Sequence, residues 1–246
     1  MQPDHSAPQR TPLPERRGYR RPPFSGPSFA QPGERGDLFA YGGFLDGGVP
    51  LDGPFAIIDL ETSALSPTQG RVLEIAITRV DRHGTVLDEM SSLIDPGDGI
   101  VGAEHIHQIS APMLAGAPCF ADLADTILKL LAGSIVVAHN AAFEDRWLGS
   151  ELARMGLTLP HLPTLDTLWL VRQLRKLPDF KLGTVVQAYG CTLADAHTAS
   201  GDVRALTALL PRMLDDAGPL QYPVGPPPLP QLSHPSRPAK PRSSGP

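Results

Sequence analysis

Apolar positions occur first in short unbroken runs and further along the chain at helical spacing. Unbroken apolar runs are typical of buried strands, and apolar residues every three or four positions are typical of amphipathic helices. The chain is therefore predicted to form strands at 55–61, 72–80, 85–94 and 135–138, and helices at 121–131, 141–155, 165–177, 182–189 and 198–214. Turn residues at 81–84 join the second and third strands into a hairpin. This order predicts an α/β fold, in which an antiparallel three-strand meander and parallel strands form one mixed sheet flanked by helices.

Proline is concentrated at the two ends of the chain. Of 28 prolines, 10 lie in residues 1–54 and 10 in residues 217–246, which leaves 8 for the 162 residues between them. Both ends are also poor in large apolar residues, so they cannot bury enough surface to offset the entropy lost on ordering. We therefore predict one compact domain at 53–216, preceded by a disordered or loosely docked arm at 1–52 and followed by a proline-rich disordered tail at 217–246.

Charge follows the same division of the chain. Residues 37–216 hold 12 Lys and Arg against 23 Asp and Glu, a formal charge of −11, whereas residues 1–36 hold six Arg against three acids. This net negative charge is opposite in sign to that of a domain that binds nucleic acid through a broad cationic face. It suits a site whose carboxylates are neutralised by metal ions, and the basic arms then either assist electrostatic capture or serve only as soluble linkers.

Several classes of protein are not expected from this composition. Two cysteines, Cys119 and Cys191, form neither a disulfide framework nor a zinc site. The first 30 residues lack the apolar centre of a signal peptide, and no run of 18 apolar residues predicts a membrane span. We expect a cytoplasmic protein that does not act at a membrane.

Three short motifs carry candidate chemistry. Asp59 and Glu61 are two positions apart on a predicted strand, so their side chains share one face, where their mutual repulsion favours a cation. Glu144 lies in the first turn of a helix, and His197 and Asp202 lie around the start of the last helix. The ordinary pKa of histidine suits a general base at neutral pH. Each motif alone is also typical of solvated strand ends and helix ends, but together they supply the groups that hold two divalent cations and activate a water against a phosphodiester.

The order and spacing of these motifs resemble those of the DEDDh 3′→5′ exonucleases. This family has an RNase H-like fold and includes the proofreading epsilon subunit of the bacterial replicative polymerase. The resemblance runs from about Phe55 to Leu214 and rests on the motifs at 59–62, 139–144 and 197–202, with shorter matches at 106–109, 165–168 and 181–184. It implies an RNase H-like mixed sheet and a 3′→5′ exonuclease.

The resemblance also implies a role for each motif residue. Asp59 is expected to bridge two metal ions, with Glu61 and Asp202 completing the site of the ion that activates the nucleophile. Glu144 is expected to serve the second ion, which stabilises the leaving 3′-oxygen, and His197 is expected to deprotonate the attacking water. Because these ligands are all oxygen atoms, the two ions are expected to be Mg²⁺ or Mn²⁺.

The implied substrate is the 3′ end of single-stranded or frayed DNA. RNA remains the alternative, because discrimination depends on contacts to the 2′-hydroxyl that no motif reveals. The residues expected to contact the terminal nucleotide are Thr62, Leu65, His107, Asn140 and Phe143. Asn140 is also expected to cap the helix that follows it, and the tails are expected to recruit replication or repair proteins.

One position departs from the family pattern, because Glu144 stands where the second motif usually has Asp. The extra methylene moves the carboxylate by about a bond length, whereas a metal site tolerates errors of only about 0.5 Å. Asp145 is adjacent but is rotated by about 100° around the helix, so it should point elsewhere. We expect Glu144 to substitute for Asp. The alternatives are a weakened or Mn²⁺-preferring second site and, from another class, a binding module that recruits partners through its tails.

Basic residues gather in one stretch of the acidic domain. They are Arg172, Arg175, Lys176 and Lys181. This cluster either follows a phosphate backbone or forms a solvated helix face.

Overall fold

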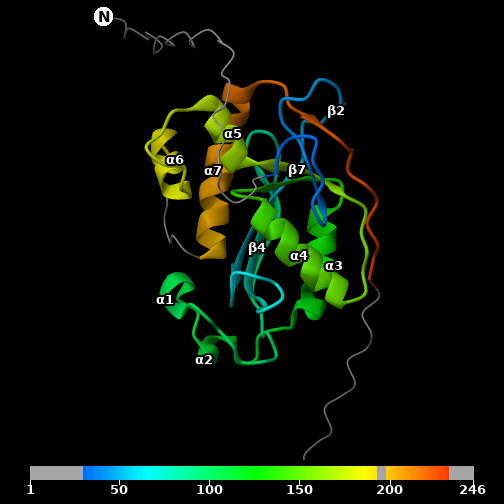
Figure 1. Cartoon of the computed structure of the whole chain (residues 1–246), viewed down its shortest axis with the longest axis vertical. Coiled ribbons are helices and arrows are strands. Elements are labelled where there is room, and N and C mark those ends of the chain that lie inside the picture. The colour runs from blue at the N-terminus through cyan, green and yellow to red at the C-terminus, as the bar shows by residue number, and fades with distance from the viewer. Residues whose placement is uncertain (1–29, 193–197, 233–246) are drawn as a thin grey trace, which may run out of the picture.

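A computed structural model describes residues 30–192 and 198–232 of the chain (Figure 1). Its strands are β1 (Phe39–Tyr41), β2 (Val49–Pro50), β3 (Phe55–Thr62), β4 (Val72–Val80), β5 (Val86–Leu93), β6 (Ile135–Ala138), β7 (Leu162–Asp166) and β8 (Gln221–Tyr222). Its helices are α1 (Glu104–His107), α2 (Ala111–Leu114), α3 (Phe120–Leu131), α4 (Ala142–Arg154), α5 (Thr167–Leu174), α6 (Leu182–Ala188) and α7 (Ala199–Ala217).

A mixed sheet of six strands organises the fold, in the order β1-β7-β6-β3-β4-β5. Strands β3, β4 and β5 form an antiparallel meander, and β6, β7 and β1 extend the sheet from β3 in parallel. The predicted fold class is therefore confirmed. Because β3 pairs with β4 on one side and β6 on the other, its carboxyl end lies near the middle of the sheet, where side chains from both faces can reach it.

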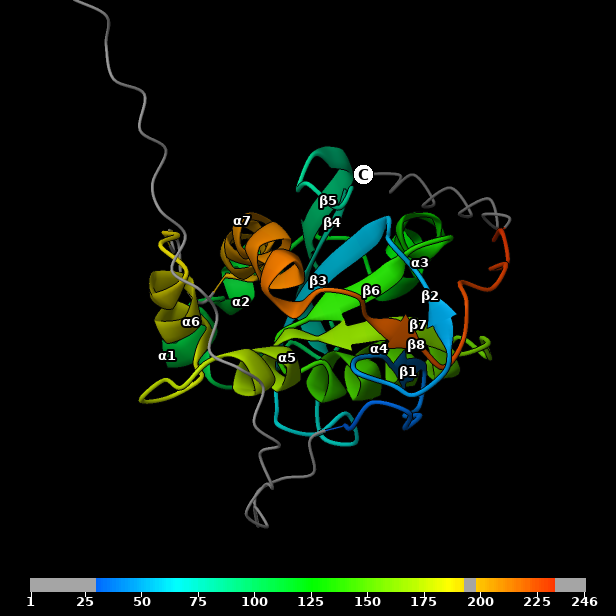
Figure 2. The same cartoon turned by 90° about the horizontal axis from the view of Figure 1, so that it is seen from above.

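The alternation of side chains along β3 divides the core into two layers. Phe55 and Ile57 point into a layer formed with α5, α6 and α7, whereas Ala56, Ile58 and Leu60 point into a layer formed with α3 and α4. The two sets of helices lie on opposite faces of the sheet (Figure 2). A strand buried on both faces needs apolar residues at successive positions, which explains the unbroken apolar run at the start of β3.

Strand β7, which lies inside the sheet between β1 and β6, was not predicted from the sequence. Residues 165–177 were expected to form a helix, but β7 occupies Leu162–Asp166 and α5 begins at Thr167. Asp166 ends the strand and caps the helix, because its carboxylate accepts hydrogen bonds from the amides of Leu168, at 2.9 Å, and Trp169, at 3.3 Å. Five residues with a proline at the second position carry too little periodicity to reveal a strand.

The ordered domain extends beyond the expected limits of 53–216. Strand β1 joins the sheet by pairing with β7, and Leu38, Phe39, Ala40 and Tyr41 are all buried. After the expected end of the domain, β8 pairs with β2, and Tyr222 is 1% exposed. The parts of the two expected tails that lie beyond 30–232 are outside the described residues.

A single carboxylate ties the N-terminal segment to the domain. Asp145 Oδ1 accepts hydrogen bonds from the amides of Leu38, at 2.7 Å, and Phe39, at 3.0 Å. Its Oδ2 accepts from the Tyr41 hydroxyl at 2.8 Å and from the Asp37 amide at 3.2 Å. Composition could not reveal this attachment, because the partner is one buried acid about a hundred residues further along the chain.

Within the described residues, no helix has the length and apolar character needed to cross a membrane.

Replacing Asp145 should loosen the N-terminal strand. Asp145→Ala leaves buried donors without an acceptor, so we expect the free energy of unfolding to fall by about 2–4 kcal/mol. Gly36→Ala should act in the same direction, since a Cβ there would lie 1.6 Å from Asp145 Oδ2. Urea denaturation measures both variants, with Asp88→Ala on the exposed edge strand β5 as the control. Equal stability of Asp145→Ala and Asp88→Ala would show that this carboxylate does not hold the segment.

Candidate active site

The carboxyl end of β3 presents two acids on one side of the sheet. Asp59 and Glu61 alternate with Leu60, which is 4% exposed and packs into the core layer with α3 and α4. Both acids are half-buried. The neighbouring strand adds a third acid, because Glu74 of β4 is the direct cross-strand partner of Glu61. Like charges placed opposite each other in a sheet are destabilising, so this arrangement is costly unless a cation or proton intervenes.

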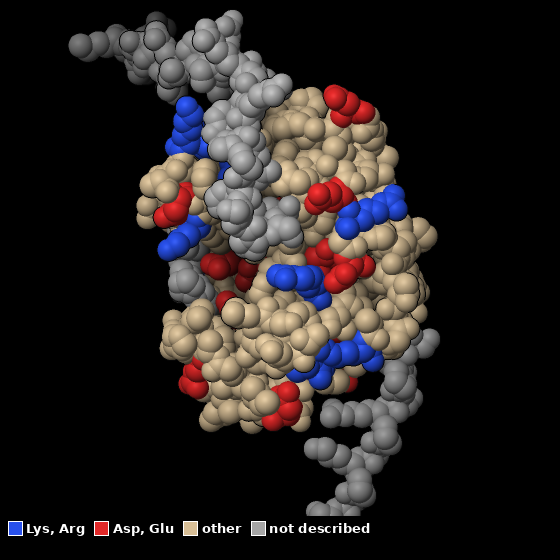
Figure 3. Space-filling view, in the orientation of Figure 1, with Lys and Arg blue, Asp and Glu red and all other residues tan. Residues whose placement is uncertain are grey.

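Helices from opposite faces of the sheet bring two further acids. Glu144 lies in the first turn of α4 and is 3% exposed, and its Oε2 has no hydrogen-bond partner in the part of the chain that the structure describes. Asp202 lies in the first turn of α7, which Thr198 caps by accepting a hydrogen bond from the Gly201 amide at 3.0 Å. Acidic side chains recessed in a hollow, with basic side chains at its margin, are visible on the face shown in Figure 3.

These acids are near enough to one another to raise each other's pKa. Burial raises the pKa of Asp59 well above its usual value, and the charges of Glu144, Asp202, Glu61 and Glu74, in that order, raise it further. Burial also raises the pKa of Glu61 to about 7, assisted by Glu74 and Asp202. The structure therefore brings together the four acids that the sequence analysis selected, Asp59, Glu61, Glu144 and Asp202.

The acids fit a divalent cation by their chemistry. Glu144 has a pKa raised first by burial and then by Asp166 and Glu61, although its own backbone amide and Arg146 oppose the shift. A buried carboxylate with an unpartnered oxygen, surrounded by other carboxylates, is stabilised by a positive charge. Over residues 30–192 and 198–232, however, no three His, Cys, Asp or Glu side chains are gathered tightly enough to form a finished metal site.

His197, the expected general base, lies outside the described residues. The residues on either side of its segment, up to Thr192 and from Thr198 onward, are described. Its role remains a prediction.

The residues expected to contact the terminal nucleotide differ in their exposure and in the contacts that they already make. Leu65 lies in the connection between β3 and β4, and its side chain is 89% exposed. Thr62 donates its hydroxyl hydrogen to the Ala64 carbonyl at 2.9 Å, and Phe143 packs against Trp147 with ring centroids 6.0 Å apart. His107 is 3% exposed, and both ring nitrogens hold its own loop, Nε2 at 2.9 Å from the Val101 carbonyl and Nδ1 accepting from the Ile109 amide. As placed, the His107 ring braces the loop and has no nitrogen left for a nucleotide.

Asn140 does not cap α4, contrary to the sequence analysis. The N-cap residue is Ala141, and no side chain caps this helix. Asn140 instead adopts a left-handed backbone with φ of 78°, and its amide donates to Asp166 Oδ1 at 3.1 Å. The tight turn between β6 and α4 requires this conformation, which asparagine tolerates better than most residues.

Two acids near the site were not selected from the sequence. Glu74 accepts a hydrogen bond from the Ala199 amide at 3.2 Å, which joins β4 to the start of α7. Asp166 holds the turn after β6 and the start of α5, and burial raises its pKa to about 6 against the opposing effect of those amides. Glu74 interrupts a run of buried apolar positions in β4, and that interruption was the available signal, whereas Asp166 stands at the end of β7 and gave no such signal.

Comparison with known proteins now identifies the family. Residues 56–210, more than half of the chain, match the sequence model of the exonuclease family of the RNase T type. The chain belongs to this exonuclease family. The match begins in β3 and ends in α7, so it includes every described acid of the site.

This exonuclease is similar to a small part of much longer curated proteins. It is 30% identical to the PolC-type DNA polymerase III of Halalkalibacterium halodurans over 185 residues, which cover 70% of the chain and 13% of that polymerase. It is 31% identical to the corresponding polymerase of Thermotoga maritima over 166 residues, which cover 67% of the chain and 12% of that polymerase. The chain thus spans 12–13% of the length of these relatives.

Solved structures agree with the family. Exonuclease X in complex with 5′-overhanging duplex DNA matches with a TM-score of 0.52 and 27% identity, over 65% of this chain and 91% of that one. The nuclease domain of 3′hExo, a DEDDh family member bound to rAMP, matches with a TM-score of 0.60 over 71% of this chain and 97% of that one; at 15% identity it supports the fold alone. The predicted membership of an exonuclease family is confirmed. The protein is a 3′→5′ exonuclease that acts on nucleic acid, from a family that uses divalent metal ions.

The stability of this exonuclease without metal should fall as pH rises. Glu61 and Asp166 have folded-state pKa values of about 7 and about 6, above their ordinary values of 4.5 and 3.8. The folded protein therefore binds more protons than the unfolded chain across that window, so stability decreases from pH 5 to pH 7.5. Urea denaturation in EDTA at several pH values measures this decrease, and Glu61→Gln should flatten it, whereas Glu89→Gln on the exposed strand β5 should not.

Added Mn²⁺ should reverse the trend. A cation binds the ionised carboxylates, so it should stabilise the folded protein more at pH 7.5 than at pH 5. Equal stabilisation at both pH values would contradict a carboxylate metal site.

Proposed function

We propose that this exonuclease removes nucleotides from the 3′ end of single-stranded or frayed DNA by a two-metal mechanism with His197 as the general base. The observation that carries the proposal is the convergence of acids from the end of β3 and from the first turns of α4 and α7, where burial and mutual repulsion raise their pKa values. Such repulsion is tolerated at functional sites, where a bound cation offsets it.

The chain offers oxygen ligands for two ions. Asp59, Glu61 and Asp202 would hold one ion, and Asp59 and Glu144 would hold the other. When bound, the ions would lower the pKa of a water nucleophile and stabilise the charge that develops on the leaving 3′-oxygen. Carboxylates favour Mg²⁺ or Mn²⁺ over softer metals, so these are the proposed cofactors.

The remaining steps belong to protein side chains. His197 would accept the proton of the attacking water, because a neutral imidazole predominates at pH 7. It lies five residues before Asp202 and next to Thr198, the cap of α7. The exposed Leu65 side chain, at 89% exposure, would pack against the base of the terminal nucleotide. The product would be a nucleoside 5′-monophosphate.

DNA is the proposed substrate because of the relatives. The curated relatives are PolC-type DNA polymerases, and exonuclease X was solved with DNA. A proofreading or repair role, with replication proteins as partners, is consistent with that similarity. An RNA-trimming activity is the second candidate, since a solved neighbour at 14% identity is a 3′-exonuclease that recognises a histone mRNA stem-loop.

Glu144 is proposed to be a working ligand despite being longer than the usual Asp. Its side chain is buried, its charge raises the pKa of Asp59 more than any other charge does, and its Oε2 lacks a hydrogen-bond partner in the described structure. A surface acid that merely stabilises the helix dipole would be solvated. The same burial argues against the alternative of a binding module, because that function does not need an unneutralised carboxylate in the core.

Degradation of labelled oligonucleotides tests this proposal. Wild-type protein should shorten single-stranded DNA from the 3′ end in Mg²⁺ or Mn²⁺, and Asp202→Ala should reduce the rate by about a thousandfold, because metal stabilisation of the transition state contributes several kcal/mol. Glu144→Gln should lose about a hundredfold, whereas Glu144→Asp should stay within about threefold in Mn²⁺. Glu89→Gln serves as the matched control on an exposed strand.

Four outcomes of this assay would contradict or change the proposal. No activity of wild-type protein on DNA or RNA would overturn the enzyme assignment, and faster degradation of RNA would replace the DNA proposal. Full activity of Glu144→Gln would remove Glu144 from the metal site. A large gain in Mg²⁺ for Glu144→Asp would show that the natural site is tuned away from Mg²⁺.

The pH profile tests the general base. The kcat/KM of wild-type protein should fall below about pH 6.5 as the base is protonated. His197→Ala should lower kcat by about a hundredfold to ten-thousandfold and remove that acidic limb. His83→Ala, in the exposed turn between β4 and β5, should leave both unchanged. An unaltered acidic limb in His197→Ala would assign the base to another group.

A further inference from the structure

The second half of α4 carries a buried carboxylate that the proposed mechanism does not use. Glu151 is 2% exposed and lies seven positions after Glu144, so the two acids face nearly the same side of the helix, two turns apart. A buried carboxylate is stable only where donors surround it, because burial of an unpaired charge is costly. The donors around Glu151 therefore show what this part of α4 is attached to.

Most of these donors come from the start of β4. The Arg71 guanidinium donates from Nε to Glu151 Oε1 at 2.9 Å and from Nη2 to Oε2 at 3.0 Å. The Val72 amide approaches Oε1 at 3.4 Å. A bidentate pair of this kind fixes the orientation of both side chains. Because Val72 is the cross-strand partner of Thr62, Glu151 joins α4 to the end of β3 beside the candidate active site.

Arg154 extends this network to the connection between β3 and β4, residues 63–71. Its Nη1 donates to Glu151 Oε1 at 2.9 Å. Its Nη2 donates to the carbonyl of Pro67 and, at 3.4 Å, to the carbonyl of Gly70. Since Glu151 orients this guanidinium, one buried carboxylate attaches the connection to α4 as well as the strand that follows it.

The base of the connection is closed and closely packed. The Ser63 amide donates to the Arg71 carbonyl at 3.0 Å, and the Ser63 hydroxyl oxygen accepts from the Arg71 amide at 2.9 Å. Two glycines leave no room for a Cβ, which would lie 2.7 Å from Ser63 Oγ at Gly70 and 1.9 Å from the Ser63 carbonyl oxygen at Gly102. The connection is therefore tightly held while it keeps the Leu65 side chain 89% exposed.

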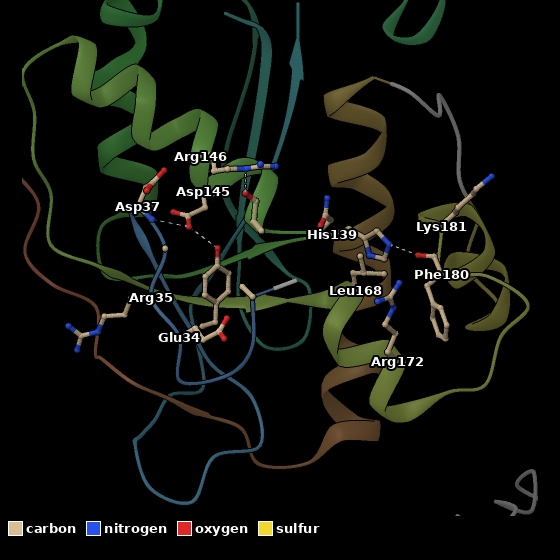
Figure 4. Close-up of a pocket in the computed structure, with 15 residues that line it drawn as sticks. Glu34, Arg35, Asp37, His139, Asp145, Arg146, Leu168, Arg172, Phe180 and Lys181 are labelled. Carbon is tan, nitrogen blue, oxygen red and sulfur yellow. Dashed lines mark hydrogen bonds between the residues drawn. The ribbon is translucent and has the colours of Figure 1, made fainter. Parts of the chain in front are cut away.

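The first turn of α4 is held independently of Glu151. Asp145 accepts hydrogen bonds from the N-terminal segment, including those from the Asp37 amide and the Tyr41 hydroxyl (Figure 4). Loss of Glu151 would therefore release the β3–β4 connection but leave the turn that carries Glu144 attached.

We propose that Glu151 is a positioning residue of this exonuclease, which holds the β3–β4 connection against α4 so that Leu65 packs on the base of the 3′-terminal nucleotide. The inference rests on the proposed function, since it takes from there the contact between Leu65 and that base. Glu151 touches neither substrate nor metal and acts through Arg71 and Arg154. Its removal should weaken binding of the strand without slowing hydrolysis of the bound strand.

Two oligonucleotides separate this role from a general effect on the fold. One is a six-nucleotide oligothymidylate, and the other differs only in lacking the base of its 3′-terminal residue. On the complete oligonucleotide in Mn²⁺, Glu151→Gln should raise KM about tenfold, because the burial of one leucine side chain is lost, and should change kcat less than about threefold. On the abasic oligonucleotide, which offers Leu65 no base, the KM of Glu151→Gln should equal that of wild-type protein.

A second variant keeps the buried charge paired. Arg154→Ala removes a side chain that is 34% exposed and breaks the attachment to Pro67 and Gly70, but leaves Glu151 bonded to Arg71. This protein should fold, and its KM should rise about fivefold on the complete oligonucleotide and stay unchanged on the abasic one.

Two further variants serve as a coupling test and a control. Leu65→Ala should raise KM about tenfold, and Glu151→Gln/Leu65→Ala should raise it no further, because both changes remove the same contact. Asp125→Asn removes another buried carboxylate, which pairs with Lys129 at 2.7 Å on α3, and should leave both KM values unchanged.

The outcomes distinguish the positioning role from the proposed function. If wild-type protein hydrolyses neither oligonucleotide, the proposed function fails. If it hydrolyses both, the positioning role is overturned when Glu151→Gln and Arg154→Ala keep the wild-type KM, raise it equally on the two oligonucleotides, or add their full effect to that of Leu65→Ala. Should Glu151→Gln not fold, Arg154→Ala decides by the same comparison.

Discussion

Repulsion among partly or fully buried carboxylates is the constraint on which this structure depends. The end of β3 places Asp59 and Glu61 beside Glu74 of β4, and Glu144 and Asp202 approach from helices on the two faces. Each ionised group makes ionisation of the others less favourable. The long antiparallel ladder between β3 and β4 and the capped start of α7 hold the acids in place against this repulsion. The carboxylates can all be ionised together only if a bound cation offsets their repulsion.

The number of hydrogen bonds that a buried carboxylate accepts distinguishes an acid that stabilises the fold from an acid of the candidate active site. Glu144 and Asp145 are adjacent in α4 and equally buried, yet the helix turns them in different directions. Asp145 accepts from three backbone amides and one hydroxyl, so its charge is fully used by the structure. Glu144 keeps an oxygen without a partner in the described chain. Glu144 and Asp145 are both buried acids, so residue type and burial do not distinguish them. The hydrogen-bond donors around each carboxylate do.

The sequence was sufficient where the signal was periodic or local. The runs behind β3, β4 and β6 and the helical spacing of α3 and α4 were long enough to predict, and the motif spacing selected four acids that the fold brings together. It failed where the deciding partner was distant. Strand β1 is fixed by Asp145, about a hundred residues away, and its own proline-rich surroundings indicated a tail. The role of Asp166 also depends on a turn from another strand, so no local pattern could reveal it.

The N-terminal segment lies outside the matched family region but is anchored to a residue inside it. The family match begins at residue 56, and β1 at 39–41 lies before it, yet the residue that anchors β1 is Asp145, inside the matched region. The anchor therefore sits one position from Glu144 and on the same helical turn, so the segment cannot shift without disturbing the helix that carries the acid. The same segment also forms one wall of a cavity of about 740 Å³, which His139 and Asn140 line from the turn into α4. One carboxylate thus connects the extension of the sheet to the helix that carries Glu144.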